Sequence, residues 1–146
     1  MSIHRLTNGA VAALLGMAGL AGQADASACD RFRFGDEVVL SGKVVTKIYP
    51  GPPNYQNVSA GDAAETVRIL KLKKPVCVDT NSQQPEDQPA LHVRVVQLVF
   101  DADVSRPGRS EVSSKNVSVT GSLFHAQTGH HHTAVLLSVR AIRLTP

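Results

Sequence analysis

The histidines of this chain are concentrated in one place. Three of its six lie in the segment Thr128-Gly129-His130-His131-His132-Thr133. Each imidazole brings a hydrogen-bond donor and an acceptor, and both need partners when the ring is buried. Neutral imidazoles bind zinc and copper, and they also form hydrogen bonds to ligands or neighbouring side chains. The cluster is therefore the first candidate for a functional site.

Two kinds of chemistry are open to this cluster. His125, His130 and His131 together offer three nitrogen ligands, a set that suits zinc or copper. A catalytic zinc would also need a nearby carboxylate, and none is adjacent in the sequence. In the metal-free alternative, the rings and the hydroxyls of Thr128 and Thr133 satisfy one another or contact a ligand. We prefer the metal-free interpretation and expect no cofactor.

A second candidate segment is Tyr49-Pro50-Gly51-Pro52-Pro53-Asn54-Tyr55. Prolines fix φ and remove backbone donors, which predicts a rigid loop that presents Tyr49, Asn54 and Tyr55. Asp62 is a further polar member of this predicted surface. Asp62 and Glu65 could also act as paired carboxylates, but no nucleophile or base is marked beside them. The alternative is a loop that packs only against its own domain.

The first 28 residues are typical of a secretory signal peptide. Arg5 is the one basic side chain before an unbroken apolar run over 10–21, and small residues then fit cleavage after Ala26 or Ala28. The run is shorter than the roughly 20 residues that cross a bilayer. We therefore expect a periplasmic or secreted protein without a transmembrane segment. Lipid anchoring at Cys29 is a less favoured alternative.

Removal of that leader leaves residues 29–146, the size of one domain, with two cysteines. An even number of cysteines in an exported protein predicts a disulfide, here between Cys29 and Cys77. In the chain-entropy model, closing a loop of about 49 residues stabilises the fold by about 3–4 kcal/mol. Two free thiols holding a metal would suit an oxidising compartment poorly.

The charge of the chain argues against a nucleic-acid partner. The formal net charge is +3, tryptophan is absent and aromatic residues make up 4% of the chain. Nucleic-acid-binding proteins concentrate their basic residues on one face and add aromatic platforms. The densest basic stretch, Arg68, Lys71, Lys73 and Lys74, is interpreted as a solvated strand face.

Short alternating segments separated by Gly, Pro and Asn predict an all-β protein. No window has a helical period. Gly42, in the middle of a long first strand, indicates a bend at a barrel corner. We therefore predict a small five-stranded Greek-key barrel of the oligonucleotide/oligosaccharide-binding (OB) type. The expected strands lie at 36–48, 65–78 (its regular part ending at Lys74-Pro75), 91–100, 117–125 and 131–144.

The alternation also predicts how the last two strands pair. Their apolar residues share a face only if paired residue numbers sum to an even total. A sum of 256 pairs Val119 with Leu137 and His125 with His131 across a five-residue loop at 126–130. His130 would then lie in the turn, and His132 would point to the other face near Phe124. A bulge is expected near Ala141-Ile142.

Several motifs taken together resemble a known bacterial family, the uncharacterised family catalogued as domain of unknown function 4431. The resemblance covers most of the chain after the predicted leader. It implies a small exported protein in which the proline-rich loop and the histidine motif belong to one site, and it implies no activity. The motifs are Gly51-Pro52-Pro53-Asn54-Tyr55, Gly61-Asp62 with Glu65, Pro75-Val76-Cys77-Val78, Val119-Thr120-Gly121-Ser122-Leu123-Phe124-His125 and Thr128-Gly129-His130-His131-His132-Thr133.

Three hypotheses for function follow. The first is a non-catalytic binding protein of the bacterial envelope, inhibitor-like or immunity-like, that contacts a protein or an envelope ligand. Its surface would combine Tyr49, Asn54, Tyr55, His125, His130 and His131, with Asp62 as a polar member. The second hypothesis is a zinc- or copper-binding module that uses the three histidines named above. An enzyme is the third, since only Asp62 and Glu65 suggest one. A toxin gene beside this one would favour the first hypothesis, and metal-resistance genes the second.

Overall fold

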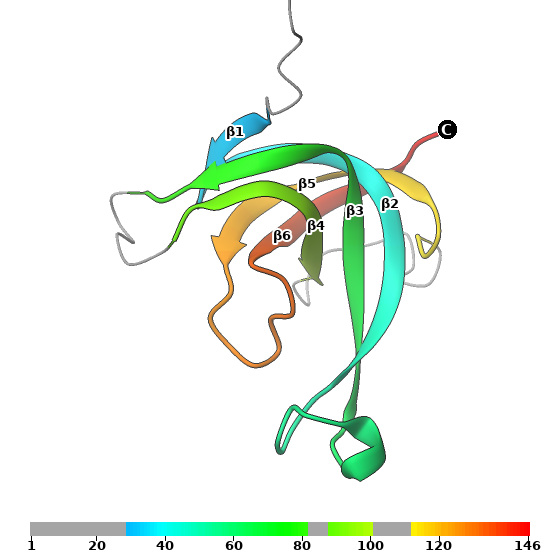
Figure 1. Ribbon diagram of the computed structural model, residues 1–146. Helices are drawn as coiled ribbons and strands as arrows, with labels where there is room; N and C mark the ends of the chain where they lie inside the picture. The colour runs from blue at the N-terminus through cyan, green and yellow to red at the C-terminus, as the bar shows by residue number, and fades with distance from the viewer. Residues whose placement is uncertain (1–28, 82–87, 101–111) are drawn as a thin grey trace, which may run out of the picture.

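The computed structural model describes residues 29–81, 88–100 and 112–146 (Figure 1). The predicted signal peptide lies outside the described residues. The six strands are β1 (Asp30–Arg33), β2 (Glu37–Pro50), β3 (Ala64–Asp79), β4 (Ala90–Phe100), β5 (Asn116–His125) and β6 (Val135–Leu144). A short 3-10 helix, η1 (Val58–Ala60), lies between β2 and β3. No helix among the described residues is long and apolar enough to cross a membrane.

Five of the strands close into a barrel. The strand order is β1-β3-β2-β5-β6-β4, and a further pairing of β3 with β4 completes the ring. All pairings within the ring are antiparallel except the one between β4 and β6, which is parallel. The predicted all-β, OB-like Greek-key barrel is therefore confirmed.

The alternating apolar residues of the strands fill the barrel. On β2, every second residue from Val38 to Val44 is buried, and the residues that alternate with them, Val39, Ser41 and Lys43, are exposed. Such a period-two pattern places one set of side chains inside and the other outside. The core consists of Phe34, Val38, Leu40, Val44, Leu70, Val76, Val78, Val96, Leu98, Val112, Val117, Val119, Leu123, Val135, Leu137, Val139 and Ile142.

Gly42 marks the point where β2 changes partner. Residues 37–43 of β2 pair with β5, and residues 42–50 pair with β3. A Cβ at Gly42 would collide with the backbone carbonyl of Lys71. The bend predicted from this glycine therefore has a steric cause, since only glycine allows the close approach of the two strands.

The first strand was not predicted, because Asp30–Arg33 is short and rich in charge. It adds to the barrel in parallel with the end of β3, where Asp30 lies opposite Val76 and Arg31 opposite Cys77. The predicted disulfide between Cys29 and Cys77 is present beside this pairing. The bond therefore fixes the start of the domain to β3.

The predicted register of the last hairpin was wrong, because the numbers of paired residues sum to 260 rather than 256. Leu123 lies opposite Leu137 and His125 opposite Val135, a sum of 260. Val119 lies opposite Ile142, because a bulge between Thr120 and Gly121 shifts the rest of the pairing. Sums of 256 and 260 place the same residues inside, so alternation determined the face but not the offset. The loop therefore spans 126–134 rather than 126–130.

The outer side of the barrel carries a second buried group. Val67, Ile69, Gln97 and Leu136 are 8%, 2%, 6% and 0% exposed, and none belongs to the barrel core. Ile69 lies opposite Gln97, and Gln97 opposite Leu136, so they form a row across β3, β4 and β6. A row buried on the outer face needs a cover.

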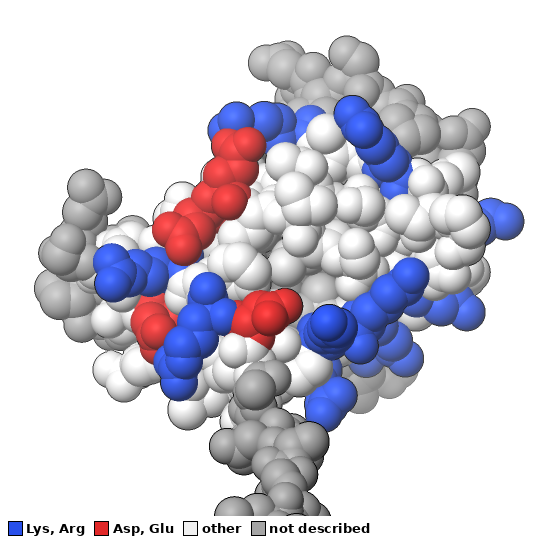
Figure 2. Space-filling model, turned by 90° about the horizontal axis from the view of Figure 1, so that it is seen from above, with Lys and Arg blue, Asp and Glu red and all other residues white. Residues whose placement is uncertain are grey.

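The basic residues are not gathered into one patch on the end of the molecule nearest β1. Figure 2 shows this end, where Lys and Arg side chains are spread around the face with Asp and Glu among them. Lys71, Lys73 and Lys74 are exposed, as predicted for a solvated strand face, whereas Arg68 is half-buried. Its guanidinium lies 5.9 Å from the centre of the Phe100 ring.

Candidate functional site

Two long loops meet at one end of the barrel. The first, 51–63, joins β2 to β3 and is called the proline loop below. The second, 126–134, joins β5 to β6 and is called the histidine loop. In barrels of this topology these two loops flank the usual binding face, which is the outer surface of the second and third strands of the barrel. Here those strands are β3 and β4.

Asp62 holds the proline loop in shape. Its buried carboxylate accepts hydrogen bonds from the backbone N–H groups of Asn54, Gln56 and Asn57, at 2.9, 2.8 and 2.9 Å. These backbone donors hold the pKa of the Asp62 carboxyl below its ordinary value. The Asn57 side chain in turn caps η1 by accepting from the N–H of Ser59. Asp62 is therefore a structural residue, and the Asn54 side chain is exposed to solvent.

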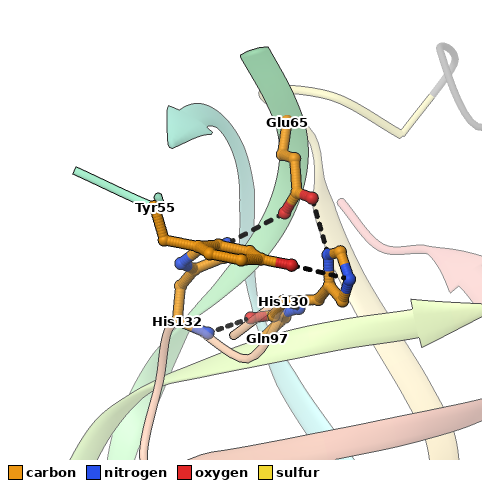
Figure 3. A network of polar contacts seen from close by, with 5 residues as sticks. All are labelled: Tyr55, Glu65, Gln97, His130 and His132. Carbon is orange, nitrogen blue, oxygen red and sulfur yellow. Dashed lines mark hydrogen bonds and ion pairs between the residues drawn. The ribbon is translucent and has the colours of Figure 1, made fainter. Parts of the chain in front are cut away.

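A carboxylate joins the two loops (Figure 3). Glu65, at the start of β3, accepts from His130 Nδ1 at 2.6 Å through Oε1. Because Nδ1 carries that proton, Nε2 of a neutral His130 is an acceptor and receives the Tyr55 hydroxyl at 3.2 Å. The second oxygen, Oε2, lies 3.4 Å from His132 Nε2. Residues from the proline loop, β3 and the histidine loop thus form one hydrogen-bonded network.

The network has a buried side and an exposed side. The His132 side chain is only 11% exposed, and its ring stacks on Tyr49 with centroids 4.1 Å apart. The His130 side chain is 56% exposed, and Tyr55 is 37% exposed. Glu65 lies between them with its side chain 21% exposed. Tyr55 and His130 are therefore the members that a partner can reach most easily.

Gln97 fastens the histidine loop to the outer face of the barrel. Its side-chain amide donates to the His130 carbonyl at 2.9 Å, and its Oε1 accepts from the His132 N–H at 2.7 Å. Its backbone N–H donates to Thr133 Oγ1 at 3.0 Å. These contacts place the loop over Gln97, the central residue of the row formed by Ile69, Gln97 and Leu136.

Two glycines allow the close packing of this site. A Cβ at Gly129 would lie 3.0 Å from the Tyr55 ring, so the ring rests directly on the backbone of the histidine loop. A Cβ at Gly51 would lie 2.6 Å from Glu65 Cγ, so the proline loop begins directly beside the carboxylate side chain. Both contacts depend on the absence of a side chain.

The structure does not bring the predicted histidine set together. His125 bonds through Nδ1 to the Ala126 carbonyl at 2.9 Å, and its ring packs edge-on against Phe34. His131 accepts from the Gln127 N–H at 2.9 Å and packs edge-on against Phe124. The predicted pairing of His125 with His131 was wrong because the register differs. The places predicted for His131 and His132 are also exchanged, since it is His131 that lies near Phe124.

The environment of His131 disfavours its charged form. Burial lowers the pKa of the His131 imidazole, and the neighbouring His130 and His132 rings lower it further. As the pH falls through 6.5, the ordinary pKa of histidine, His131 is protonated in the unfolded chain before it is protonated in the folded protein. The stability that a neutral His131 contributes is therefore complete above pH 6.5 and declines as the pH falls towards its folded-state pKa.

The described residues contain one His, Cys, Asp or Glu group compact enough for a metal ion, Cys29, Cys77 and His92. Both of its sulfurs are engaged in the disulfide. In the Glu65 network, His130 and His132 bind different oxygens of one carboxylate, so they do not converge on one point. The geometry therefore suits hydrogen bonding better than metal coordination.

Two members of the network, Gln97 and His132, were not predicted. Gln97 interrupts the apolar run Val95-Val96-Gln97-Leu98-Val99, and a lone amide in such a run is a signal that a loop or ligand bonds to it. The sequence suggests Asp62 as the functional partner of Glu65, whereas the structure pairs Glu65 with two histidines.

The comparisons with known proteins identify one family. The model of the family described as Domain of unknown function (DUF4431) matches residues 95–143. No curated protein and no solved structure matches the chain. The matched segment runs from β4 to β6 and contains Gln97 and the whole histidine loop, while the proline loop lies outside it. The resemblance to domain of unknown function 4431 is therefore confirmed for the part of the chain that builds the histidine side of the site.

Proposed function

We propose that this protein is an exported, non-catalytic binding protein of the bacterial envelope. It contacts a protein or an envelope ligand, in the manner of an inhibitor or immunity protein, through the proline and histidine loops. One observation carries this proposal: the Tyr55–His130–Glu65 network locks the two loops into one surface at the end where such barrels bind their ligands.

The surface is organised before any partner arrives. Asp62 fixes the proline loop and Gln97 fixes the histidine loop, so binding costs little further ordering of the backbone. Tyr55 supplies an aromatic ring with a polar end, the type of side chain that dominates many contact surfaces. Both ring nitrogens of His130 are bonded within the protein, Nδ1 to Glu65 and Nε2 to the Tyr55 hydroxyl, which supports a contact role for this ring.

Export is part of the proposal. The leader-like sequence over 1–28 and the disulfide between Cys29 and Cys77 both suit an oxidising compartment outside the cytoplasm. The disulfide also takes up the Cys29 sulfur that a lipid anchor would require. Intact mass of the protein recovered from the periplasm tests this point. Recovery only as an unprocessed chain that starts at Met1 in the cytoplasm would contradict export.

The binding role is tested with the full chain as bait in an extract of the bacterial envelope. Quantitative mass spectrometry compares the wild type with a Tyr55→Ala, His130→Ala double variant and with Leu144→Ala. Leu144 is a matched control because it is 58% exposed and lies at the far end of β6. We expect a component captured by the wild type and the control but not by the double variant. The purified component should then bind in calorimetry with micromolar or tighter affinity.

Two results would contradict the proposal. One is capture that the double variant retains in full, because the two loops would then not be the contact surface. The other is micromolar or tighter zinc or copper binding that is lost in a His130→Ala, His132→Ala variant, which would favour a metal-binding module. Circular dichroism of each variant separates loss of contact from loss of fold.

A further inference from the structure

A groove opens where β3 exchanges one neighbour for another. The pairing of β3 with β2 ends at Leu72, and its pairing with β1 begins at Val76. On the other edge, the register with β4 jumps from Lys71 to Val76, which confirms the predicted end of regular structure at Lys74-Pro75. Within the described chain, residues 73–75 of β3 thus have no strand partner on either side.

The strands β1 and β2 form the walls of this groove. They diverge from a tight turn over 34–36, in which the Asp36 N–H donates to the Arg33 carbonyl at 3.1 Å. The turn itself does not line the groove, whose lining residues come from β1, β2 and β3. The volume of the groove is 290 Å³, near the lower limit of the roughly 300–1,000 Å³ typical of small-molecule sites.

The lining of the groove is apolar with a charged edge. Leu40 and Val76 are buried, Phe32 and Leu72 are partly buried, and Val39 at the edge is 63% exposed. Such an exposed valine beside an apolar floor leaves hydrophobic surface in contact with water. The complete lining is Asp30, Phe32, Val39, Leu40, Ser41, Leu72, Lys73, Lys74 and Val76.

The charges of the groove favour an anion. The charged residues that line the groove are Lys73, Lys74 and Asp30, two cations against one carboxylate. The ion pairs found among the described residues involve Arg31, Arg140, His130 and His132, and neither of these lysines. Two lysines in the lining of an apolar groove are complementary to a molecule with one anionic end and one apolar end.

We propose that this groove binds a small amphiphile that carries a single anionic head, such as a carboxylate or a sulfate, on a short apolar body. The apolar body lies on Phe32, Leu40, Leu72 and Val76, and the head lies beside Lys73 and Lys74. With a volume of 290 Å³, the groove is too small for a folded partner. It lies seven residues along β3 from Glu65, about 23 Å at the rise of a strand, so it is independent of the function proposed above.

The test titrates the full processed chain with decanoate, decyl sulfate and decan-1-ol, each below its aggregation limit, by calorimetry. We expect saturable one-to-one binding of both anions and at least about tenfold weaker binding of the neutral alcohol, since a charge-assisted hydrogen bond is lost. A Lys73→Met, Lys74→Met variant keeps apolar stems of similar length and should bind both anions about tenfold more weakly. Val39→Asp should weaken all three ligands.

A matched charge control is available on the neighbouring face. Lys43 and Lys71 lie opposite each other across β2 and β3 and do not line the groove. A Lys43→Met, Lys71→Met variant should therefore leave decanoate binding unchanged. If this control lost as much affinity for decanoate as the Lys73→Met, Lys74→Met variant, general charge attraction would explain the binding and the proposal would be overturned. The absence of saturable binding would also overturn it, and so would binding of an extended acidic peptide in place of decanoate.

Discussion

Gln97→Leu tests whether one buried amide holds the histidine loop on the barrel. Leucine has similar bulk, but it removes the donor to the His130 carbonyl and the acceptor of the His132 N–H. A buried group left without its partner costs about 1–3 kcal/mol. The His130 carbonyl belongs to an exposed residue and can take water, so its cost lies near the lower limit, whereas the His132 N–H lies on the covered side.

These two costs sum to about 2–4 kcal/mol. Leucine beside Ile69 and Leu136, its direct neighbours across β3 and β6, recovers about 1 kcal/mol through apolar contact. We therefore expect the free energy of unfolding to fall by about 1–3 kcal/mol. If the loop instead detaches as a unit, the free energy of global unfolding falls by less, and the amides of the loop lose protection against hydrogen exchange.

Two measurements separate these outcomes. Urea unfolding followed by circular dichroism gives the global free energy, and amide hydrogen exchange of His132 gives the local one. Gln127→Leu is the matched control, because it makes the same chemical change at an exposed position of the same loop. An unfolding free energy of Gln97→Leu within about 0.5 kcal/mol of the control, together with full protection of the His132 amide, would refute the role assigned to Gln97.

Three further predictions concern the loops and the disulfide. Gly129→Ala should displace the Tyr55 ring by a few tenths of an ångström and change stability by about 0.5 kcal/mol or less, and a change in the imidazole NMR signals of the histidine loop would report the displacement. Because the folded-state pKa of Asp62 is lowered, the stability that its carboxylate contributes is complete above its ordinary value of 3.8 and is lost as the pH falls through the folded-state pKa. The Asp62→Asn variant should therefore be less stable than the wild type at pH 7, and in thermal scans from pH 7 to 2 it should lack this acid-dependent loss. Melting temperatures of variant and wild type that fall in parallel with pH would contradict the bonds from Asp62 to the proline loop. Replacing both Cys29 and Cys77 by alanine should cost about 2–5 kcal/mol in urea unfolding, and an unchanged midpoint would mean that the cross-link does not restrain the unfolded chain.

Much of the fold follows from local sequence patterns. Alternating apolar residues identified the five barrel strands, and Gly42 identified the bend, because each depends on side chains near in sequence. The pairing offset of β5 with β6 was not accessible in the same way. Side-chain alternation repeats every two residues, so offsets that differ by four bury the same residues. The hydrogen bonds from Gln97 to the histidine loop that accompany the actual offset span 33 and 36 residues of sequence.

The candidate site shows the same division between local and distant information. Residue type and clustering pointed to Tyr49, Tyr55 and His130. The structure places Tyr55 and His130 in the network, and Tyr49 stacks on His132, another member of it. Clustering in sequence also suggested that His131 belongs with His130. The His131 N–H donates to the Thr128 carbonyl and closes a turn, in which His131 lies against Phe124 and His130 against Glu65. The choice between them depends on where β3 places Glu65, which the sequence does not reveal.

The position of the histidine loop raises a mechanistic question that binding data can answer. In barrels of this type the outer face of β3 and β4 is itself the usual binding surface, and here the loop covers the row formed by Ile69, Gln97 and Leu136. If the loop is the contact surface, its attachment organises it, so Gln97→Leu should weaken capture of the partner identified with the wild type. If the partner instead binds beneath the loop, releasing the loop removes a competing interaction and the same variant should bind more tightly. Tighter binding by Gln97→Leu would therefore reassign the contact surface from the loop to the strands below it. Weaker binding by Gln97→Leu, with unchanged binding by Gln127→Leu, would keep the contact surface at Tyr55 and His130.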